Sequence, residues 1–318
     1  MDRYSLYSPL LGELPEIRRA RDCRLYDKHG NRYLDLWRNG GRALLGHRPD
    51  RVYGELKRVL QKGTVAEYPS VYISRLKKAL KTLFPGQWEI RLFANPERAL
   101  MVAKNLLSRS LTPPQMPRGN LFESLGTDMH PTPSRPPVET EIAQQKYVST
   151  GFVEPFFLPE HISQTPPLYY RPFYTFDYGA SPLVFPILPF PGSFAPQPLF
   201  IGPLYQSQLP PNDDPISPML LATLTRTVWH LISALRKPNP TWDQWKLLGW
   251  KQFSCYAIPQ FDQKHYPAVF RIFLEQKILI PPTPIDPLIL PVEWSSGEKA
   301  LVEEVAKRAL QGGVDGSI

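Results

Sequence analysis

Proline is spread unevenly along this chain, and its distribution limits what the middle of the chain can fold into. The sequence contains 38 prolines in 318 residues, and 23 of them lie between Pro113 and Pro218. Proline has no backbone N–H and its φ is fixed near −65°, so it ends helices and is confined to edge strands and bulges. The region 113–218 therefore cannot be mostly helical or built from long central strands.

Two parts of this proline-rich region have different compositions. Residues 112–145 mix Pro, Ser, Thr, Gly and Met, which predicts a loop or a partly disordered insertion. Residues 178–212 carry no charge and are rich in Leu, Phe, Ile and Pro. Their prolines argue against a helix that spans a membrane, because such a helix must satisfy its own backbone hydrogen bonds. We expect one buried strand there, at 183–188, followed by extended loops.

The N-terminal end predicts a hairpin and a helix. Apolar residues on both sides of His29-Gly30-Asn31 indicate two strands within 24–36, and Gly and Asn supply the positive φ that a tight turn needs. A glycine pair at 40–41 and a Gly-His-Arg-Pro turn at 46–49 follow, and apolar residues spaced by four predict a helix over 52–60. We expect His47 to be structural.

The C-terminal end predicts alternating helices and short strands. Helices are expected at 217–235 and 266–276, and strands at 253–258, 278–280 and 287–291. Ser217 is a candidate N-cap with Pro218 at the first helical position. Ser295 and Glu298 form the pattern of a capping box, which predicts that the closing helix begins there.

The two ends, in this order and with this spacing, resemble the class III aminotransferases, and especially their glutamate-1-semialdehyde aminomutase-like branch. These are pyridoxal-phosphate enzymes of fold type I. The resemblance implies an α/β fold with a reduced large domain and a small C-terminal α+β domain. It predicts an N-terminal segment at 1–60 that associates with the small domain, a reduced, Pro-rich large domain at 61–215, and the small domain at 216–318.

The same resemblance implies a lysine that forms a Schiff base with the cofactor, upstream of the helix that begins near Ser217. No lysine occurs between Lys146 and Lys237. Lys146 lies too early in the chain for this role, and Lys237 lies too late. We therefore predict a site that has lost its Schiff-base lysine, with no catalytic, cofactor-binding or metal-binding residues.

The remaining cofactor contacts that the family implies are also altered. The family's phosphate-binding segment corresponds to 93–104, where Asn95-Pro96 replaces a glycine-containing pair. Proline has no N–H to offer a phosphate, whereas Asn at the cap and Pro at the first position suit a helix start. The aromatic stacking motif has no counterpart. Asp177 follows the strand-like run 173–176, and we interpret it as a turn residue and not as the partner of a pyridinium nitrogen.

Neither the net charge nor the cysteines and histidines point to another kind of site. The net charge of +8 is compatible with nucleic-acid binding, but no RNA- or DNA-binding signature is present, and solvated helix faces explain the basic clusters. The two cysteines and six histidines show no metal-ligand spacing. The N-terminus lacks a signal pattern, so we expect a cytoplasmic protein that does not enter a membrane.

Three functions therefore stay open. The first is a non-catalytic aminotransferase-like protein without bound cofactor, which acts as a binding subunit, as a homodimer or paired with a related subunit. The second is an active pyridoxal-phosphate aminotransferase or aminomutase with a displaced lysine. The third is a basic interaction protein. We favour them in this order.

Overall fold

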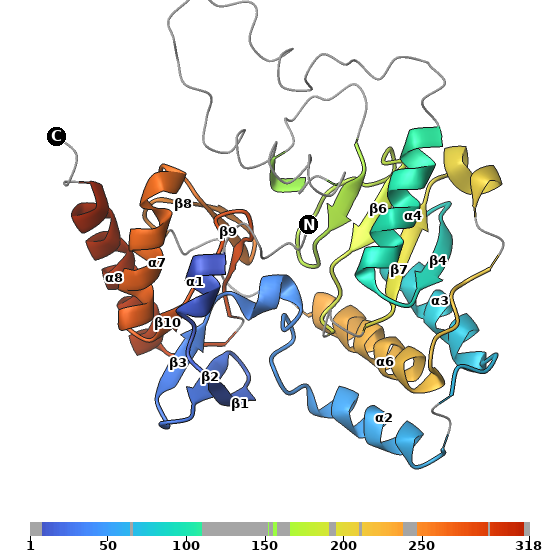
Figure 1. The fold of residues 1–318 in the computed structure, drawn as a ribbon, viewed down its shortest axis with the longest axis horizontal. Helices are drawn as coiled ribbons and strands as arrows, with labels where there is room; N and C mark the ends of the chain where they lie inside the picture. Colours follow the sequence, from blue (N-terminus) through green and yellow to red (C-terminus); the bar gives the residue numbers. More distant parts are fainter. Residues whose placement is uncertain are drawn as a thin grey trace, which may run out of the picture.

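The computed structural model of the chain describes residues 8–63, 66–109, 152, 155–157, 166–190, 195–209, 212–237, 247–291 and 293–314. The insertion expected at 112–145 lies outside these residues. In the described part, the strands form three sheets. Figure 1 shows the N-terminal strands and the short first helix beside the C-terminal helices, while helices from the middle of the chain lie around a separate sheet.

The first sheet joins the two ends of the chain. Its order is β1-β2-β3-β10, with bounds Ile17–Arg21, Arg24–Asp27, Arg32–Asp35 and Ile278–Leu279. β2 and β3 pair antiparallel, which confirms the predicted hairpin. The Asp27 carboxylate closes the turn, because it accepts hydrogen bonds from the backbone N–H of His29 at 2.9 Å and of Asn31 at 2.8 Å. β10 runs parallel to β3, so the chain ends share one sheet.

The second sheet corrects one expectation. Its order is β11-β9-β8, with bounds Leu288–Ile289, Tyr256–Pro259 and Trp250–Phe253. The sequence predicts a single strand over 253–258, and this is wrong, because the chain reverses at Ser254. Ser254 has a φ of 57°, in the left-handed region that ends a strand. β8 and β9 therefore form an antiparallel hairpin.

Helices cover these two sheets and close the first hydrophobic core. Their bounds are Ser8–Gly12 for α1, Tyr266–Glu275 for α7 and Ser296–Val314 for α8. α7 and α8 bury Phe270, Phe273 and Val302 in this core. The predicted capping box is confirmed, since Glu298 N donates to Ser295 Oγ at 3.1 Å and Ser295 N donates to Glu298 Oε2 at 2.9 Å.

The third sheet is the scaffold of the candidate site. Its order is β4-β7-β6-β5, with bounds Glu89–Phe93, Gln197–Ile201, Leu183–Pro186 and Leu168–Tyr170. The buried strand expected at 183–188 is confirmed as β6. The strand-like run 173–176 is instead a loop, in which Phe173 has a φ of 67°. The strand that precedes this loop is β5, which the aromatic pattern placed five residues too late.

Helices cover both faces of the third sheet (Figure 1). They have the bounds Asp50–Leu60 (α2), Val71–Leu83 (α3), Pro96–Arg109 (α4) and Pro218–Leu235 (α6). Successive strand residues point to opposite faces: Leu92 and Val184 join the core under α3 and α6, while Phe93 and Phe185 join the core under α4. Short 3₁₀ helices span Arg38–Gly41 (η2), Pro155–Phe157 (η4), Pro203–Gln208 (η5) and Gln263–His265 (η7).

The sequence predicts that α6 belongs to the small domain at 216–318, but the helix packs on the third sheet. The helix begins at the predicted residue, with Ser217 at the N-cap and Pro218 at the first turn. Its buried residues Leu221, Leu224 and Val228 lie in the core of the third sheet, and it packs against α2 and α3. The apolar stripe of a helix predicts that one face is buried, but it does not indicate which sheet that face covers.

Candidate functional site

The carboxyl ends of three strands meet at one edge of the third sheet. β4 and β6 both pair antiparallel with β7, and β5 pairs parallel with β6, so β4, β5 and β6 run in the same direction. In open α/β sheets, ligands bind outside the carboxyl ends of the strands. This carboxyl edge, where β4 leads to α4, β5 to Arg171 and β6 to Leu188, is therefore the place where the family-like cofactor site is expected.

At the β4 end, the start of α4 is capped from within the chain. Asn95 Oδ1 accepts a hydrogen bond from Arg98 N at 2.9 Å, which confirms Asn95 as the predicted cap. Ala94 N donates to Asp214 Oδ2 at 3.0 Å, and Pro96 has no N–H. Arg98 Nε lies 2.8 Å from the same Asp214 oxygen. A carboxylate of the chain itself thus lies beside the start of this helix, where the helix dipole favours negative charge.

At the β5 end lies Arg171, which sequence reasoning missed. Its side chain is fully buried, its Nη1 donates to the carbonyl of Gly40, and its guanidinium lies 5.9 Å from the centre of the Tyr256 ring. Gly41 makes this packing possible, since a Cβ built on it would lie 3.1 Å from Arg171 Nη1 and 3.3 Å from Ile187 Cγ2. The carboxyl edge therefore holds a buried cation at the end of β5.

At the β6 end, polar side chains donate hydrogen bonds to backbone carbonyl groups. Gln197 is fully buried, and its Nε2 donates to the carbonyls of Pro186 at 3.0 Å and Pro198 at 2.9 Å. Arg42 donates to the Leu188 carbonyl at 3.5 Å and to Gln197 Oε1 at 3.4 Å. The Leu188 side chain itself is buried in the hydrophobic core.

One lysine does approach the end of β4, from α3. Lys77 Nζ forms an ion pair with Asp213 Oδ2 at 2.8 Å, and Asp213 Oδ1 accepts a hydrogen bond from Leu92 N at 2.9 Å. The sequence did not point to Lys77, because the family resemblance implies a Schiff-base lysine in the segment before α6. Lys237, in contrast, follows the last turn of α6, where its N–H bonds to the Ala234 carbonyl.

His47 and Asp177 both have structural roles. His47 Nε2 lies 2.6 Å from Asp35 Oδ2, and Asp35 Oδ1 accepts hydrogen bonds from the N–H groups of Trp37 and Arg38, both at 2.9 Å. This network fixes the entry to η2, as expected for a structural histidine. Asp177 accepts a hydrogen bond from Gly179 N at 2.9 Å, so it is the turn residue that the sequence predicts.

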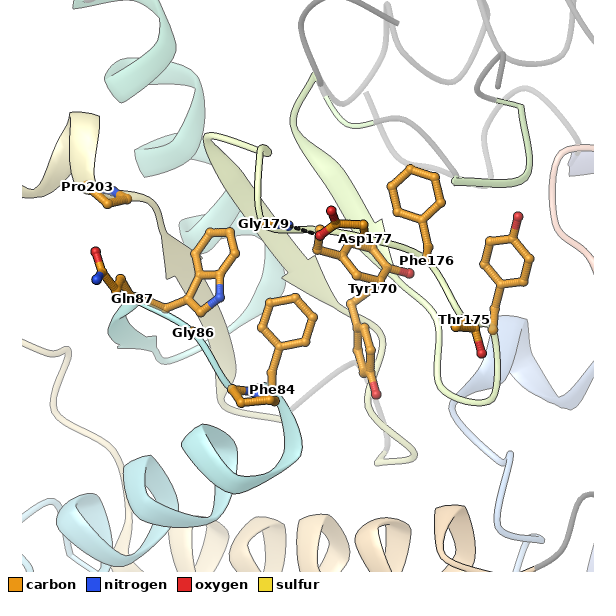
Figure 2. Close-up of a pocket in the computed structure, with 13 residues that line it drawn as sticks. Phe84, Gly86, Gln87, Tyr170, Thr175, Phe176, Asp177, Gly179 and Pro203 are labelled. Carbon is orange, nitrogen blue, oxygen red and sulfur yellow. Dashed lines mark hydrogen bonds between the residues drawn. The ribbon is translucent and has the colours of Figure 1, made fainter. Parts of the chain in front are cut away.

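A hollow lies beside this Asp177 turn. It has a volume of about 530 Å³ and lies between the α3–β4 connection and the loop that follows β5. Figure 2 shows Phe84 and Gln87 on one side of this hollow and Phe176 and Asp177 on the other. We call it the aromatic pocket, because its lining includes six aromatic residues: Phe84, Trp88, Tyr170, Tyr174, Phe176 and Tyr178.

Other kinds of site find little support within the described ranges. No group of three or more His, Cys, Asp or Glu residues is arranged there to hold a metal ion. In the same ranges, each helix is either too short or too polar to cross a lipid bilayer.

Comparisons of the sequence with known proteins give short matches. No family model matches the chain. An uncharacterized protein of Borreliella burgdorferi is 40% identical over 85 residues, which are 27% of this chain and 32% of that protein. The glutamate-1-semialdehyde 2,1-aminomutase of Limosilactobacillus reuteri is 32% identical over 90 residues, which are 28% of this chain and 21% of the enzyme. The chain thus spans less than a third of the length of these curated relatives.

Solved structures give a much longer match. The ornithine aminotransferase of Toxoplasma gondii aligns with a TM-score of 0.63 and 13% identity, over 95% of this chain and 90% of that one. An omega-transaminase of Sphaerobacter thermophilus aligns with a TM-score of 0.63 and 14% identity, over 94% of this chain and 91% of that one. The architecture and these likenesses show that the chain has a reduced class III pyridoxal-phosphate aminotransferase-like fold.

Proposed function

We propose that the chain is a non-catalytic aminotransferase-like protein that has lost the Schiff-base lysine and acts as a binding or dimer-partner subunit. The main support is the carboxyl edge, where β5 continues into Arg171 and β6 into Leu188, with no lysine from 147 to 236. Pyridoxal phosphate needs an amine that condenses with its aldehyde. The residues at the ends of β5 and β6 do not supply that amine, so they do not fit the cofactor.

The start of α4 supports the same conclusion for the cofactor's phosphate. A phosphate is held at a helix N-terminus by free backbone N–H groups. Here Ala94 N is bonded to Asp214, Arg98 N is bonded to Asn95, and Pro96 has no N–H. An incoming phosphate would also meet the negative charge of Asp214, whose side chain is 10% exposed.

A surface around α2 supports the dimer-partner part of the proposal. Four large apolar side chains are exposed on α2, on the segment before α3 and at the first residue of α3, with exposed fractions of 45% for Tyr53, 45% for Leu60, 70% for Tyr68 and 64% for Val71. Apolar side chains that form one patch on a surface mark interaction sites, and we propose that these four form such a patch. Enzymes that the sequence resembles are dimers, so we assign this α2 surface to a second copy or to a related subunit.

A titration with pyridoxal phosphate tests the proposal. Purified protein is mixed with increasing cofactor, and both visible absorbance and bound cofactor after dialysis are measured. We expect no absorbance band of a protein-bound imine and no stoichiometric retention. One retained cofactor per chain, with an imine band that sodium borohydride removes, would contradict the proposal.

If the chain is instead an active enzyme, Lys77 is the candidate for its displaced Schiff-base lysine. Its ammonium lies at the same end of β4 as the start of α4, because Asp213 bonds both Lys77 Nζ and Leu92 N. If the chain retained cofactor, the Lys77→Met variant would lose it and the Lys104→Met variant, altered on α4, would keep it. That pair of results would establish a displaced Schiff-base lysine.

A further inference from the structure

One wall of the aromatic pocket lies away from the carboxyl edge. Gly86 and Gln87 line it just before β4 begins, and Pro203 lines it just after β7 ends. Because β4 and β7 are antiparallel, these residues share the edge of the sheet opposite to the start of α4. Tyr170, the last residue of β5, lines the pocket as well, so the pocket extends from that opposite edge toward the end of β5.

The walls of the pocket are formed by rings that pack at steep angles to one another. The Phe84 and Tyr178 centroids are 5.3 Å apart with planes inclined by 64°, and those of Phe176 and Tyr178 are 5.1 Å apart with planes inclined by 67°. Phe84 and Tyr170 are likewise 5.1 Å apart at 68°. These rings pack against one another along the pocket wall, and aromatic faces attract cations.

The charge in the pocket also favours a positively charged ligand. Asp177 is the one charged residue among the 13 that line the pocket, although the whole chain carries a net charge of +8. The hydrogen bond from Gly179 N holds one oxygen of this exposed carboxylate. A carboxylate within an aromatic lining selects for a positively charged ligand.

The pocket also offers a hydrogen-bond donor. Gly86 lets the Trp88 indole lie against its backbone, since a Cβ there would be 2.5 Å from Trp88 Nε1. Gly86 has a φ of 145°. Nε1 has no acceptor among the described residues and is not sealed from solvent, so it can donate to a ligand oxygen. Buried Trp rings commonly find such a partner for their N–H.

We propose that the aromatic pocket binds a small organic cation, a substituted ammonium group that also carries an oxygen acceptor. The rings contact the alkylated ammonium, Asp177 balances its charge, and Trp88 donates to the oxygen. The volume of about 530 Å³ lies in the range of small-molecule sites. No chemical step is required of the pocket, because the function is binding.

The test compares two probes of the same shape on the full chain by isothermal titration calorimetry. Choline carries the charge and a hydroxyl, and 3,3-dimethylbutan-1-ol replaces its nitrogen with carbon. We expect choline to bind about tenfold more tightly, because cation–π attraction and Asp177 act on the charged probe alone. Equal affinities, or no binding of choline, would overturn the proposal. A proline-rich peptide that binds while choline does not would assign the pocket to a peptide and overturn it as well.

Matched variants locate the binding. Asp177→Asn keeps an acceptor for Gly179 N but removes the charge, so choline affinity should fall by roughly three- to tenfold while that of the neutral probe stays the same. Asp22→Asn is the control, since Asp22 is an exposed carboxylate in the β1–β2 turn, in an ion pair with Arg21. Thermal unfolding confirms that both variants are folded. Choline affinities that fall equally in the two variants would place the site elsewhere.

Discussion

Asp214 pairs with Arg98 across the start of α4, with 2.8 Å between Asp214 Oδ2 and Arg98 Nε. The same oxygen accepts the Ala94 N–H at 3.0 Å. Asp214 comes from the segment before α6, so this contact also ties α6 to the end of β4. An aspartate of the chain thus lies beside the helix N-terminus, which attracts negative charge.

The Asp214→Asn substitution should destabilise the protein. It removes the charge that Arg98 and the α4 N-terminus both attract, and hydrogen bonds to charged groups contribute about 1.5–3 kcal/mol. We expect the free energy of unfolding in urea to fall by about 1–2 kcal/mol. Asp22→Asn, at an exposed turn, should change it by less than about 0.5 kcal/mol. Equal effects of the two substitutions would contradict the role assigned to Asp214.

Two glycine substitutions isolate the packing around Arg171. Gly41 and Gly30 have φ angles of 101° and 86°, so alanine is strained at both, by roughly 1–2 kcal/mol. A Cβ at Gly30 meets nothing within 4 Å, whereas at Gly41 it lies 3.1 Å from Arg171 Nη1. We expect Gly41→Ala to lower the free energy of unfolding by about 1–3 kcal/mol more than Gly30→Ala does. The prediction fails if the two variants unfold at the same urea concentration.

The tie between Arg24 and Glu298 should make stability depend on pH. Burial by itself raises the pKa of Glu298, but hydrogen bonds from Arg24 and Ser295 outweigh it and lower the pKa below its ordinary value. Arg24 Nη2 lies 2.8 Å from Glu298 Oε2. A carboxyl with a lowered pKa in the folded state stabilises above its unfolded pKa of about 4.3 and loses this effect as the pH falls through the folded pKa.

The Glu298→Gln variant measures this contribution. At pH 7 it should be less stable than the parent chain by about 1–2 kcal/mol. Urea unfolding repeated at decreasing pH should show the difference shrinking below about pH 4.3. A difference that is constant from pH 7 to pH 3 would show that the glutamate charge does not act through Arg24.

We expect the α2 surface to hold two chains together, and negative charges introduced on it to separate them. Leu60→Glu and Tyr68→Glu place charges on an apolar interface, where an unpaired buried charge is costly. Light scattering of the parent chain at micromolar concentration should report a dimer, and the double variant should be monomeric. Leu204→Glu, at a side chain that is 82% exposed on η5, is the control and should stay dimeric. A monomeric parent chain would remove the assignment of this surface.

Local sequence patterns predicted the helices and turns well, because their signals act over a few residues. Asn95 and Ser295 cap helices where the sequence places them, and Gly30 lies in the predicted hairpin turn with a positive φ. The Ser254 reversal was missed because a serine at positive φ has no strong sequence signal. In the same way, the aromatic run 173–176 resembled a strand, although the ladder forms at Leu168–Tyr170.

The candidate site was harder to predict, because its residues meet only in three dimensions. The lack of lysine between 147 and 236 was visible in the sequence. The approach of Asp214 to Ala94, across 120 residues, and of Arg171 to Gly40, across 131 residues, was not. An arginine in an apolar stretch was the one available signal for Arg171, since a buried cation needs specific partners. The aromatic pocket likewise joins the 84–88 and 170–179 segments, which no local pattern connects.

We propose that no lysine of this chain forms an imine with pyridoxal phosphate in the aminotransferase-like site. Equimolar protein and cofactor are incubated, reduced with sodium borohydride and digested, and the peptides are analysed by mass spectrometry. The loss of the lysine predicts no stoichiometric pyridoxyl adduct on any peptide. A single lysine, Lys77 included, modified at one pyridoxyl group per chain would contradict it.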